Sequence, residues 1–115
     1  STAAGFFHFF YIVMISTTRL QELIEENDVV LFGKGEKGHS NCEMTLRLQE
    51  MFEEIFPDYE MVDVEEDPEM SSEIRSLSGC SVFPQVFIYG EFAGDYDTVC
   101  ELEEDGELYD MIGQD

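Results

Sequence analysis

One stretch, residues 29–45, constrains the fold more than any other part of the chain. It reads VVLFGKGEKGHSNCEMT, and its four leading apolar residues predict a buried strand. A loop rich in glycine, lysine and serine follows, after which a helix is expected to begin. Ser40 and Glu43 have the spacing of a capping box, which would place Cys42 in the first helical turn. This order of elements would deliver one thiol to the N-terminus of a helix.

The start of a helix favours the thiolate form of a cysteine. Unpaired backbone N–H groups and the positive end of the helix dipole stabilise negative charge there, and Lys34 is expected close by. A free cysteine is also a common small apolar residue. Local context therefore supports a reactive Cys42 and an inert Cys42 about equally.

The charge composition limits the partners that this chain can bind. Its 115 residues include 27 acidic and 5 basic side chains, which give a net charge of −22. Such a surface repels nucleic acids and anionic membranes, so we expect basic or neutral partners and no nucleic acid.

The three cysteines, Cys42, Cys80 and Cys100, are widely spaced. They form neither a disulfide framework nor a zinc site, and they fit a reducing intracellular compartment, cytoplasmic or mitochondrial. Buried apolar positions are expected for Cys80 and Cys100. A resolving role for Cys80 stays open.

The first fifteen residues form an apolar extension of unknown role, ahead of a single domain predicted over residues 16–115. The apolar run over residues 6–15 is about half the roughly twenty residues that a membrane span needs. We therefore expect no membrane span within this chain. A docking strand, the remainder of an anchor and a segment without function all remain open for the extension.

Hydrophobic spacing and turn signals predict the remaining elements. Helices are expected over about residues 17–27, 42–56, 68–78 and 97–105, with a short turn after Gly106. Strands are expected over about residues 29–32, 60–64, 85–89 and 91–93.

The connections between these elements predict the topology of the sheet. A helical crossover makes the first two strands parallel, and a tight turn at Gly90 makes the last two antiparallel. The apolar stripe of the second helix, including Met44, Leu48 and Phe52, is predicted to be core. The predicted fold class is α/β, a thioredoxin-like mixed four-stranded sheet with helices on both faces.

The order and spacing of the motifs resemble a glutaredoxin of the monothiol subclass. In that subclass a Lys-Gly pair lies eight residues before the cysteine of a C-G-F-S motif, and Lys34-Gly35 precedes Cys42 by the same distance. Residues 82–85 (VFPQ) resemble the segment that holds the family's cis-proline. Residues 90–97 (GEFAGDYD) resemble its G-E-x-x-G-G-x-D motif. The resemblance covers about residues 17–113 and implies a glutaredoxin fold.

Three positions depart from the family pattern. C-G-F-S is replaced by residues 42–45 (CEMT), the Trp-Pro pair before the cis-proline segment is Cys80-Ser81, and the second glycine of Gly-Gly is Asp95. The scaffold is therefore expected to be retained while the lining of the active site differs. Glu43 beside the thiol would oppose thiolate formation and could crowd a dimer.

The resemblance implies a glutathione site around Cys42. Two cations would hold carboxylates, an extended backbone would pair with the peptide, and a helix start would hold the γ-glutamyl group. The implied residues are Lys34, Arg75, Phe83, Pro84, Tyr96, Asp97 and Thr98. Taken singly, Lys34, Arg75 and Asp97 could instead be surface charges or a helix cap.

Three functions remain open from the sequence. The first is a glutathione-dependent thiol–disulfide oxidoreductase, which would remove glutathione from glutathionylated proteins through Cys42. The second is a carrier of a glutathione-ligated [2Fe–2S] cluster that bridges a homodimer, with Cys42 as the metal ligand, as the resemblance implies. The third is a redox-inert acidic binding domain of the same fold.

Overall fold

The computed structural model describes residues 19–113, so the predicted apolar extension lies outside the described residues. A helix over residues 19–26 leads into four strands and four further helices. In chain order these are β1 (Val29–Gly33), α2 (Glu43–Ile55), β2 (Glu60–Asp63), α3 (Pro68–Ser78), β3 (Gln85–Ile88), β4 (Glu91–Asp95), α4 (Tyr96–Glu104) and α5 (Glu107–Ile112).

The four strands form one mixed sheet in the order β2-β1-β3-β4. β1 runs parallel to β2 and antiparallel to β3, and β3 runs antiparallel to β4. The crossover through α2 and the turn at Gly90, which has a positive φ of 81°, account for these directions. The topology predicted from the sequence is confirmed.

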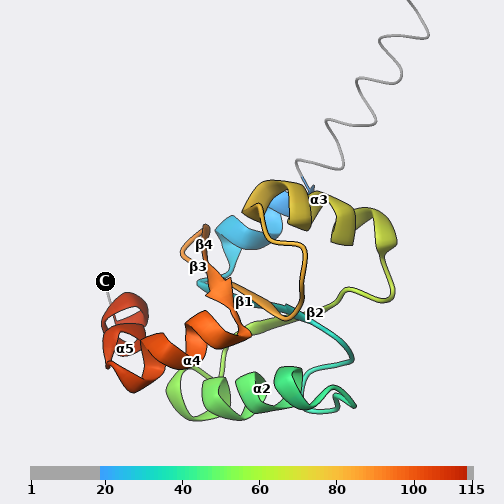
Figure 1. The fold of residues 1–115 in the computed structure, drawn as a ribbon. Helices are drawn as coiled ribbons and strands as arrows, with labels where there is room; N and C mark the ends of the chain where they lie inside the picture. The colour runs from blue at the N-terminus through green and yellow to red at the C-terminus, as the bar shows by residue number, and fades with distance from the viewer. Residues whose placement is uncertain (1–18, 114–115) are drawn as a thin grey trace, which may run out of the picture.

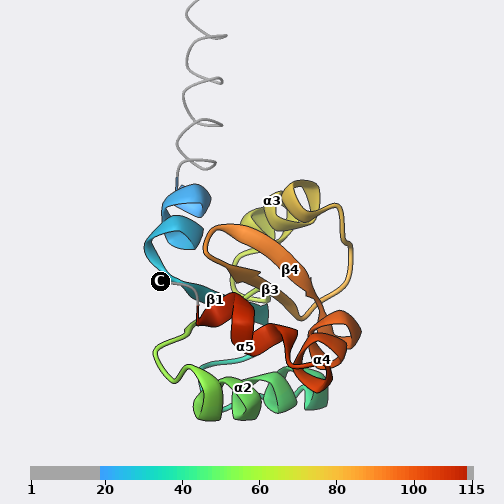
Figure 2. The same cartoon turned by 90° about the vertical axis from the view of Figure 1, so that its left-hand side faces the viewer.

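Alternate residues of β1 build two cores, one on each face of the sheet. Val29 and Leu31 belong to a cluster with residues of α2, α4 and α5. Val30 and Phe32 belong to a second cluster with residues of the first helix and of α3. Figures 1 and 2 show the corresponding layers, with α2, α4 and α5 on one face and α3 on the other. β1 is therefore buried on both faces, as its continuous apolar run predicts.

The start of α2 differs from the predicted capping box. Cys42 is itself the N-cap, with extended φ and ψ of −87° and 118°, and no side chain caps this helix end. The Ser40 hydroxyl instead accepts a hydrogen bond from the Cys42 N–H at 3.0 Å. Glu43 does not reach back, because its carboxylate pairs with Arg47 at 3.0 Å.

Met44 is a second correction at this helix. The residue is 50% exposed, whereas Leu48 and Phe52 of the same predicted stripe are fully buried. Thr45 and Gln49 occupy buried positions of α2 instead. Near the start of α2 the side that faces the core therefore carries polar residues, and Met44 lies at the surface, close in sequence to Cys42.

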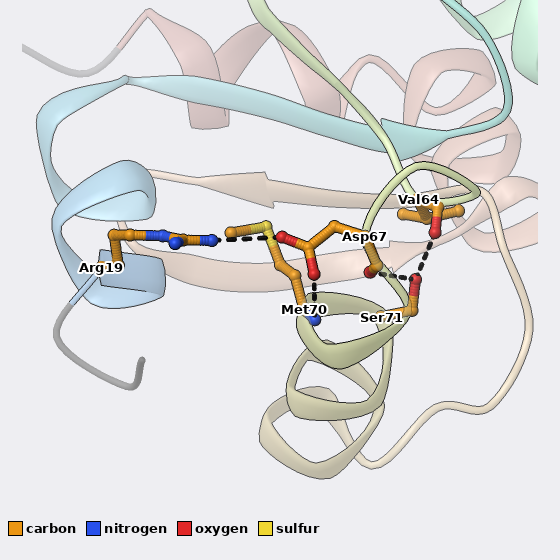
Figure 3. A network of polar contacts seen from close by, with 5 residues as sticks. All are labelled: Arg19, Val64, Asp67, Met70 and Ser71. Carbon is orange, nitrogen blue, oxygen red and sulfur yellow. Dashed lines mark hydrogen bonds and ion pairs between the residues drawn. The ribbon is translucent and has the colours of Figure 1, made fainter. Parts of the chain in front are cut away.

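The segment after β2 is fixed by a polar network at the start of α3 (Figure 3). Asp67 caps α3 by accepting from the Met70 N–H at 3.0 Å, and it also pairs with Arg19 at 3.1 Å. The Ser71 hydroxyl donates to the Val64 carbonyl at 2.6 Å. The segment between β2 and α3 is therefore bound both by the first helix, through Arg19, and by α3, through Ser71.

α4 begins earlier than predicted. Its N-cap is Asp95, whose carboxylate accepts from the Thr98 N–H at 3.1 Å. Gly94 allows this approach, since a Cβ there would lie 2.6 Å from Thr98 Cγ2. Asp97 therefore lies in the first turn of α4 and is not its cap.

Candidate active site

The sheet register gathers most of the predicted site residues at one edge of the sheet. Phe32 pairs with Gln85, and Gln85 pairs with Asp95. Lys34 follows β1, Pro84 precedes β3 and Tyr96 follows β4. These three residues therefore lie at the same end of three adjacent strands. Lys34 and Cys42 also line one cleft of about 410 Å³. The candidate site is therefore the edge of the sheet next to the start of α2.

The Cys42 thiol lies at the start of α2 and is half-buried. A hydrogen bond from the Thr45 side chain is the main cause that lowers the pKa of this thiol, and the backbone N–H groups of Thr45 and Met44 add to it. The charge of Lys34 lowers the pKa further, while partial burial opposes these effects. The direction of this pKa shift agrees with the thiolate predicted at this helix start.

Thr45 is a candidate site residue that the sequence analysis does not single out. It is fully buried, and its hydroxyl oxygen also accepts from the Lys34 N–H at 3.3 Å. The close approach needs a glycine at the end of β1, since a Cβ on Gly33 would lie 2.7 Å from Thr45 Cγ2. The signal in the sequence is the hydroxyl three residues after the cysteine, the spacing at which a side chain in the first helical turn faces the N-cap.

The loop over residues 34–41 is tied along the flank of α2. The Lys37 ammonium donates to the Pro57 and Tyr59 carbonyls at 2.8 and 2.6 Å, just beyond the end of that helix. It also lies 4.1 Å from the centroid of the Tyr59 ring. Burial raises the pKa of Tyr59 to about 12, so the ring is neutral and the contact is a cation–π interaction. The buried Gln49 side chain donates to the Glu36 carbonyl at 2.9 Å.

The two ends of this loop are joined close to the thiol. The Ser40 hydroxyl donates to the Lys34 carbonyl and accepts from the Cys42 N–H. Although much of the loop is solvent-exposed, these contacts fix Lys34 and Cys42 relative to each other.

Lys34 differs from the other four basic residues of the chain. Arg19 pairs with Asp67, Arg47 pairs with Glu43, Lys37 binds carbonyls, and Arg75 binds the Ser81 carbonyl. Within residues 19–113, the Lys34 side chain alone among the five makes no hydrogen bond or ion pair. Its ammonium group is therefore available to an anion in the cleft beside Cys42.

Glu43 is neutralised locally and does not stand alone beside the thiol. Arg47 binds its carboxylate at 3.0 Å and also donates to the Tyr96 hydroxyl at 3.3 Å. This bridge links the first turn of α2 to the first residue of α4. The opposition to thiolate formation that was expected from Glu43 is therefore reduced.

The loop before Pro84 is braced, and its peptide bond has the form that the family resemblance implies. The Phe83–Pro84 bond is cis. Gln85 donates to the carbonyls of Cys80 and Val82 at 2.8 and 2.9 Å. The Arg75 guanidinium donates to the Ser81 carbonyl at 3.0 Å and lies 5.0 Å from the centroid of the Phe83 ring. Arg75 and Phe83 are thus brought together.

Not every predicted site residue is joined to the thiol. Among residues 19–113, no hydrogen bond or ion pair links Cys42 to Arg75, Phe83 or Asp97. The side chains of Asp97 and Thr98 are exposed at the start of α4.

The other two cysteines are not fully buried, contrary to the expectation from the sequence. Cys100 is half-buried and packs against the core that contains residues of α2, α4 and α5. Cys80 is also half-buried, but it belongs to neither core cluster. All three cysteines are free thiols.

Two absences hold for residues 19–113, the part of the chain that the structure describes. No group of three or more His, Cys, Asp or Glu side chains there could hold a metal ion. None of the helices there has the length and apolar character required to cross a membrane. A mixed four-stranded sheet in this order, with helices on both faces and a cysteine at the start of α2, defines a thioredoxin-fold protein.

Comparisons with known proteins identify the family. A family model described as Glutaredoxin matches residues 29–93. Human glutaredoxin-3 is 33% identical over 94 residues, which make up 82% of this chain and 28% of the human protein. An uncharacterized monothiol glutaredoxin, ycf64-like, from Synechocystis is 32% identical over 94 residues, or 82% of this chain and 88% of that protein. The solution structure of reduced poplar apo GrxS14 matches with a TM-score of 0.76 at 28% identity, and covers 84% of this chain and 89% of that one.

The chain therefore belongs to the glutaredoxin family, and its relatives identify it as a monothiol glutaredoxin. The thioredoxin-like fold predicted from the sequence is confirmed by the same comparisons. The chain spans less than a third of the length of the human protein that it matches, at 28%.

Proposed function

We propose that this protein is a glutathione-dependent thiol–disulfide oxidoreductase, in which Cys42 removes glutathione from glutathionylated proteins. One observation carries the proposal. The pKa of the Cys42 thiol is lowered by Thr45, by two backbone N–H groups and by Lys34, and this thiol opens onto a cleft of about 410 Å³. A thiolate is the nucleophile in thiol–disulfide exchange, and an accessible one can reach a disulfide.

The proposed reaction has two exchange steps. The Cys42 thiolate attacks the glutathione sulfur of a protein–glutathione disulfide, and the protein leaves as a thiolate that takes a proton from water. A second glutathione thiolate then attacks the Cys42–glutathione disulfide, which releases oxidised glutathione and restores the Cys42 thiolate. No second protein thiol takes part, so Cys80 and Cys100 are not required.

The proposed glutathione site combines two unoccupied side chains with groups of the braced loop before Pro84. Lys34 has an unpaired ammonium group in the cleft, and Asp97 is not occupied in capping α4, because Asp95 caps it. Phe83, before the cis bond to Pro84, would offer backbone groups to the peptide, and Arg75 lies against its ring. Backbone N–H groups from Tyr96 to Thr98 would hold the γ-glutamyl carboxylate.

A chemical-shift titration with glutathione tests this site. Exposed charge pairs contribute about 0.2–1 kcal/mol each, so Lys34→Ala, Arg75→Ala and Asp97→Ala should each weaken binding several-fold. Arg19→Ala is the matched control, since it removes one cation that pairs with Asp67. If the signals of Cys42, Phe83 and Asp97 stay unchanged at millimolar glutathione, the site is lost and a redox-inert binding domain becomes the better account.

A [2Fe–2S] cluster is a second candidate for the same thiol. Four ligands are needed, and within residues 19–113 no three metal-binding side chains gather. Cys42 from each of two chains, together with two glutathione thiolates, would complete the set. The half-exposed thiol and the monothiol relatives favour this candidate. Anaerobic reconstitution with iron, sulfide and glutathione should give the visible absorption of a cluster, and Cys42→Ser should abolish it.

The three free cysteines fit a reducing compartment, cytoplasmic or mitochondrial, in which Cys42 is kept available. Glutathionylated proteins with basic surfaces are the proposed macromolecular partners, since the net charge is −22.

A further inference from the structure

Gln85 is a buried polar residue directly after the cis bond of the candidate site. Its side chain is fully buried, and its backbone is the first position of β3, paired with Phe32 of β1 and with Asp95 of β4. β3 lies between these two strands. The sheet therefore holds Gln85 on both sides, which gives its side chain a fixed base next to Pro84.

The amide group of Gln85 is committed to two carbonyls of the loop before the cis bond. Its nitrogen donates to the Cys80 and Val82 carbonyls at 2.8 and 2.9 Å, which uses both amide hydrogens. The oxygen of the same amide is buried and has no hydrogen-bond partner in the described part of the chain. Exchanging the two amide atoms would bring this oxygen against two carbonyl oxygens, so the loop determines the orientation of the group.

The unpaired amide oxygen limits what Gln85 contributes to stability. A buried acceptor without a partner destabilises the folded state, and this cost offsets part of the gain from the two hydrogen bonds. A methionine of similar length would fill the space without a buried polar atom that needs a partner. The distinctive contribution of the glutamine is therefore the position that it gives to the loop.

The held loop leaves the backbone of Phe83 available to a ligand. The Arg75 side chain binds the Ser81 carbonyl at 3.0 Å, so three successive carbonyls, from Cys80 to Val82, are bound by side chains. Phe83 comes next and is half-buried, and its N–H and C=O make no hydrogen bond within residues 19–113. These are the backbone groups that the proposed site offers to the peptide of glutathione.

We infer that Gln85 is a positioning residue for glutathione: its amide holds the loop carbonyls toward the core, so that the N–H and C=O of Phe83 face the ligand. The inference rests on the proposed glutathione site and deepens it, because it makes the affinity of that site depend on a side chain that does not touch the ligand. Gln85 is not among the groups that lower the pKa of the Cys42 thiol. The effect of Gln85 should therefore fall on binding and leave the nucleophile unchanged.

Gln85→Met tests the inference, because it keeps the length of the buried side chain and removes both donors. Glutathione should bind this variant about five- to tenfold more weakly in a chemical-shift titration. The KM for a glutathionylated peptide should rise by a similar factor, while kcat changes little. Iodoacetamide should label Cys42 at the wild-type rate, since Thr45, Met44 and Lys34 remain in place.

Asn27→Ala is the matched control. The Asn27 amide also donates to a backbone carbonyl, that of Leu23 at 2.9 Å, but it precedes β1, whereas the candidate site follows the other end of this strand. Asn27→Ala should leave the affinity for glutathione unchanged. An equal loss of affinity in both variants would assign the effect to general destabilisation and refute the positioning role.

Hydrogen exchange in the wild-type protein keeps the inference testable even if Gln85→Met does not fold. The side-chain N–H groups of Gln85 should exchange with solvent far more slowly than those of Gln21, which is exposed. Saturating glutathione should slow exchange of the Phe83 backbone N–H. Exchange of the Gln85 amide as fast as that of Gln21, or a Phe83 N–H that glutathione does not protect, would contradict the inference.

The remaining outcomes separate this inference from the proposed function. Unchanged glutathione affinity in folded Gln85→Met would overturn the positioning role and leave the proposed function intact. Slower labelling of Cys42 in step with the loss of binding would show a general disturbance of the site, which also overturns it. If the wild-type protein does not bind glutathione at all, the proposed function fails, and this inference fails with it.

Discussion

Replacing Thr45 with valine should make Cys42 a weaker nucleophile near neutral pH while keeping the shape of the core. The Thr45 hydroxyl is the main cause that lowers the pKa of the Cys42 thiol, and the side chain is fully buried beneath the loop. Valine has almost the same volume but cannot hydrogen-bond the thiolate. The pKa of Cys42 should therefore rise in Thr45→Val.

The magnitude follows from the kind of contact that is lost. A hydrogen bond to a charged group contributes about 1.5–3 kcal/mol. Because Cys42 is only half-buried, solvent screening reduces this to about 1 kcal/mol. Well below the pKa, the thiolate fraction should then fall about fivefold. Valine also leaves the Lys34 N–H without its acceptor, so a loss of stability of about 1 kcal/mol should accompany the change.

The assay is the rate of iodoacetamide labelling of each cysteine as a function of pH, resolved by peptide mass spectrometry. In the wild-type protein Cys42 should label first. In Thr45→Val its labelling should be about fivefold slower near neutral pH and unchanged at high pH, where the thiol is ionised in both proteins. Thr45→Ser retains a hydroxyl and should behave like the wild type. An unchanged pH midpoint in Thr45→Val would refute the role of the hydroxyl, and faster labelling of Cys80 or Cys100 would refute the choice of nucleophile.

Three further perturbations test the supporting structure. Lys37→Met should speed hydrogen exchange of the amides in residues 35–40, whereas Lys37→Arg should preserve much of their protection; identical exchange in Lys37→Met and the wild type would contradict the anchoring role. Gly33→Ala should lower the free energy of unfolding by about 1–3 kcal/mol, since its Cβ would lie 2.7 Å from Thr45 Cγ2, and Thr45→Ala should relieve part of this loss in denaturant titrations. At low salt the protein should pass through a heparin column without retention, because its net charge is −22, and retention would show that the charge argument is wrong.

A pH-dependent contribution to stability follows from the same thiol. The pKa of Cys42 is lowered from an ordinary value of 9.0, so the folded state favours the thiolate form more than the unfolded state does. This contribution is complete above the unfolded pKa and is lost as the pH falls through the folded pKa. The stability difference between the wild type and Cys42→Ser should therefore grow as the pH rises toward 9, which urea titrations at several pH values would measure.

The sequence predicted the scaffold better than the lining of the site. Continuous apolar runs and Gly90 determine the strands and their directions, because burial on two faces and a tight turn leave few alternatives. The capping box predicted between Ser40 and Glu43 does not form, because the Ser40 hydroxyl binds other backbone groups. It donates to the Lys34 carbonyl and accepts from the Cys42 N–H. The spacing of a capping box cannot reveal the Lys34 carbonyl as an alternative partner, since the loop brings this carbonyl to Ser40 only in the folded structure.

Thr45 and Lys37 were missed for a related reason. Their roles depend on partners that are distant along the chain: Thr45 approaches Gly33 and Lys34 across the loop, and Lys37 reaches the carbonyls of Pro57 and Tyr59 beyond the far end of α2. Such contacts are decided by how the loop lies on the helix.

The basic residues explain how so acidic a protein could still receive an anionic ligand. With five cations against 27 carboxylates, any unpaired cation would be expected to attract a neighbouring acid. Arg19 and Arg47 do so, whereas Lys37 and Arg75 bind backbone carbonyls. The Lys34 side chain makes no ion pair among residues 19–113, although Asp63 and Glu65 line the same cleft, and its backbone is fixed by Thr45 and Ser40. The fold thus gives four cations a carboxylate or carbonyl partner and leaves the Lys34 ammonium unpaired beside the thiol, where the proposed chemistry needs it.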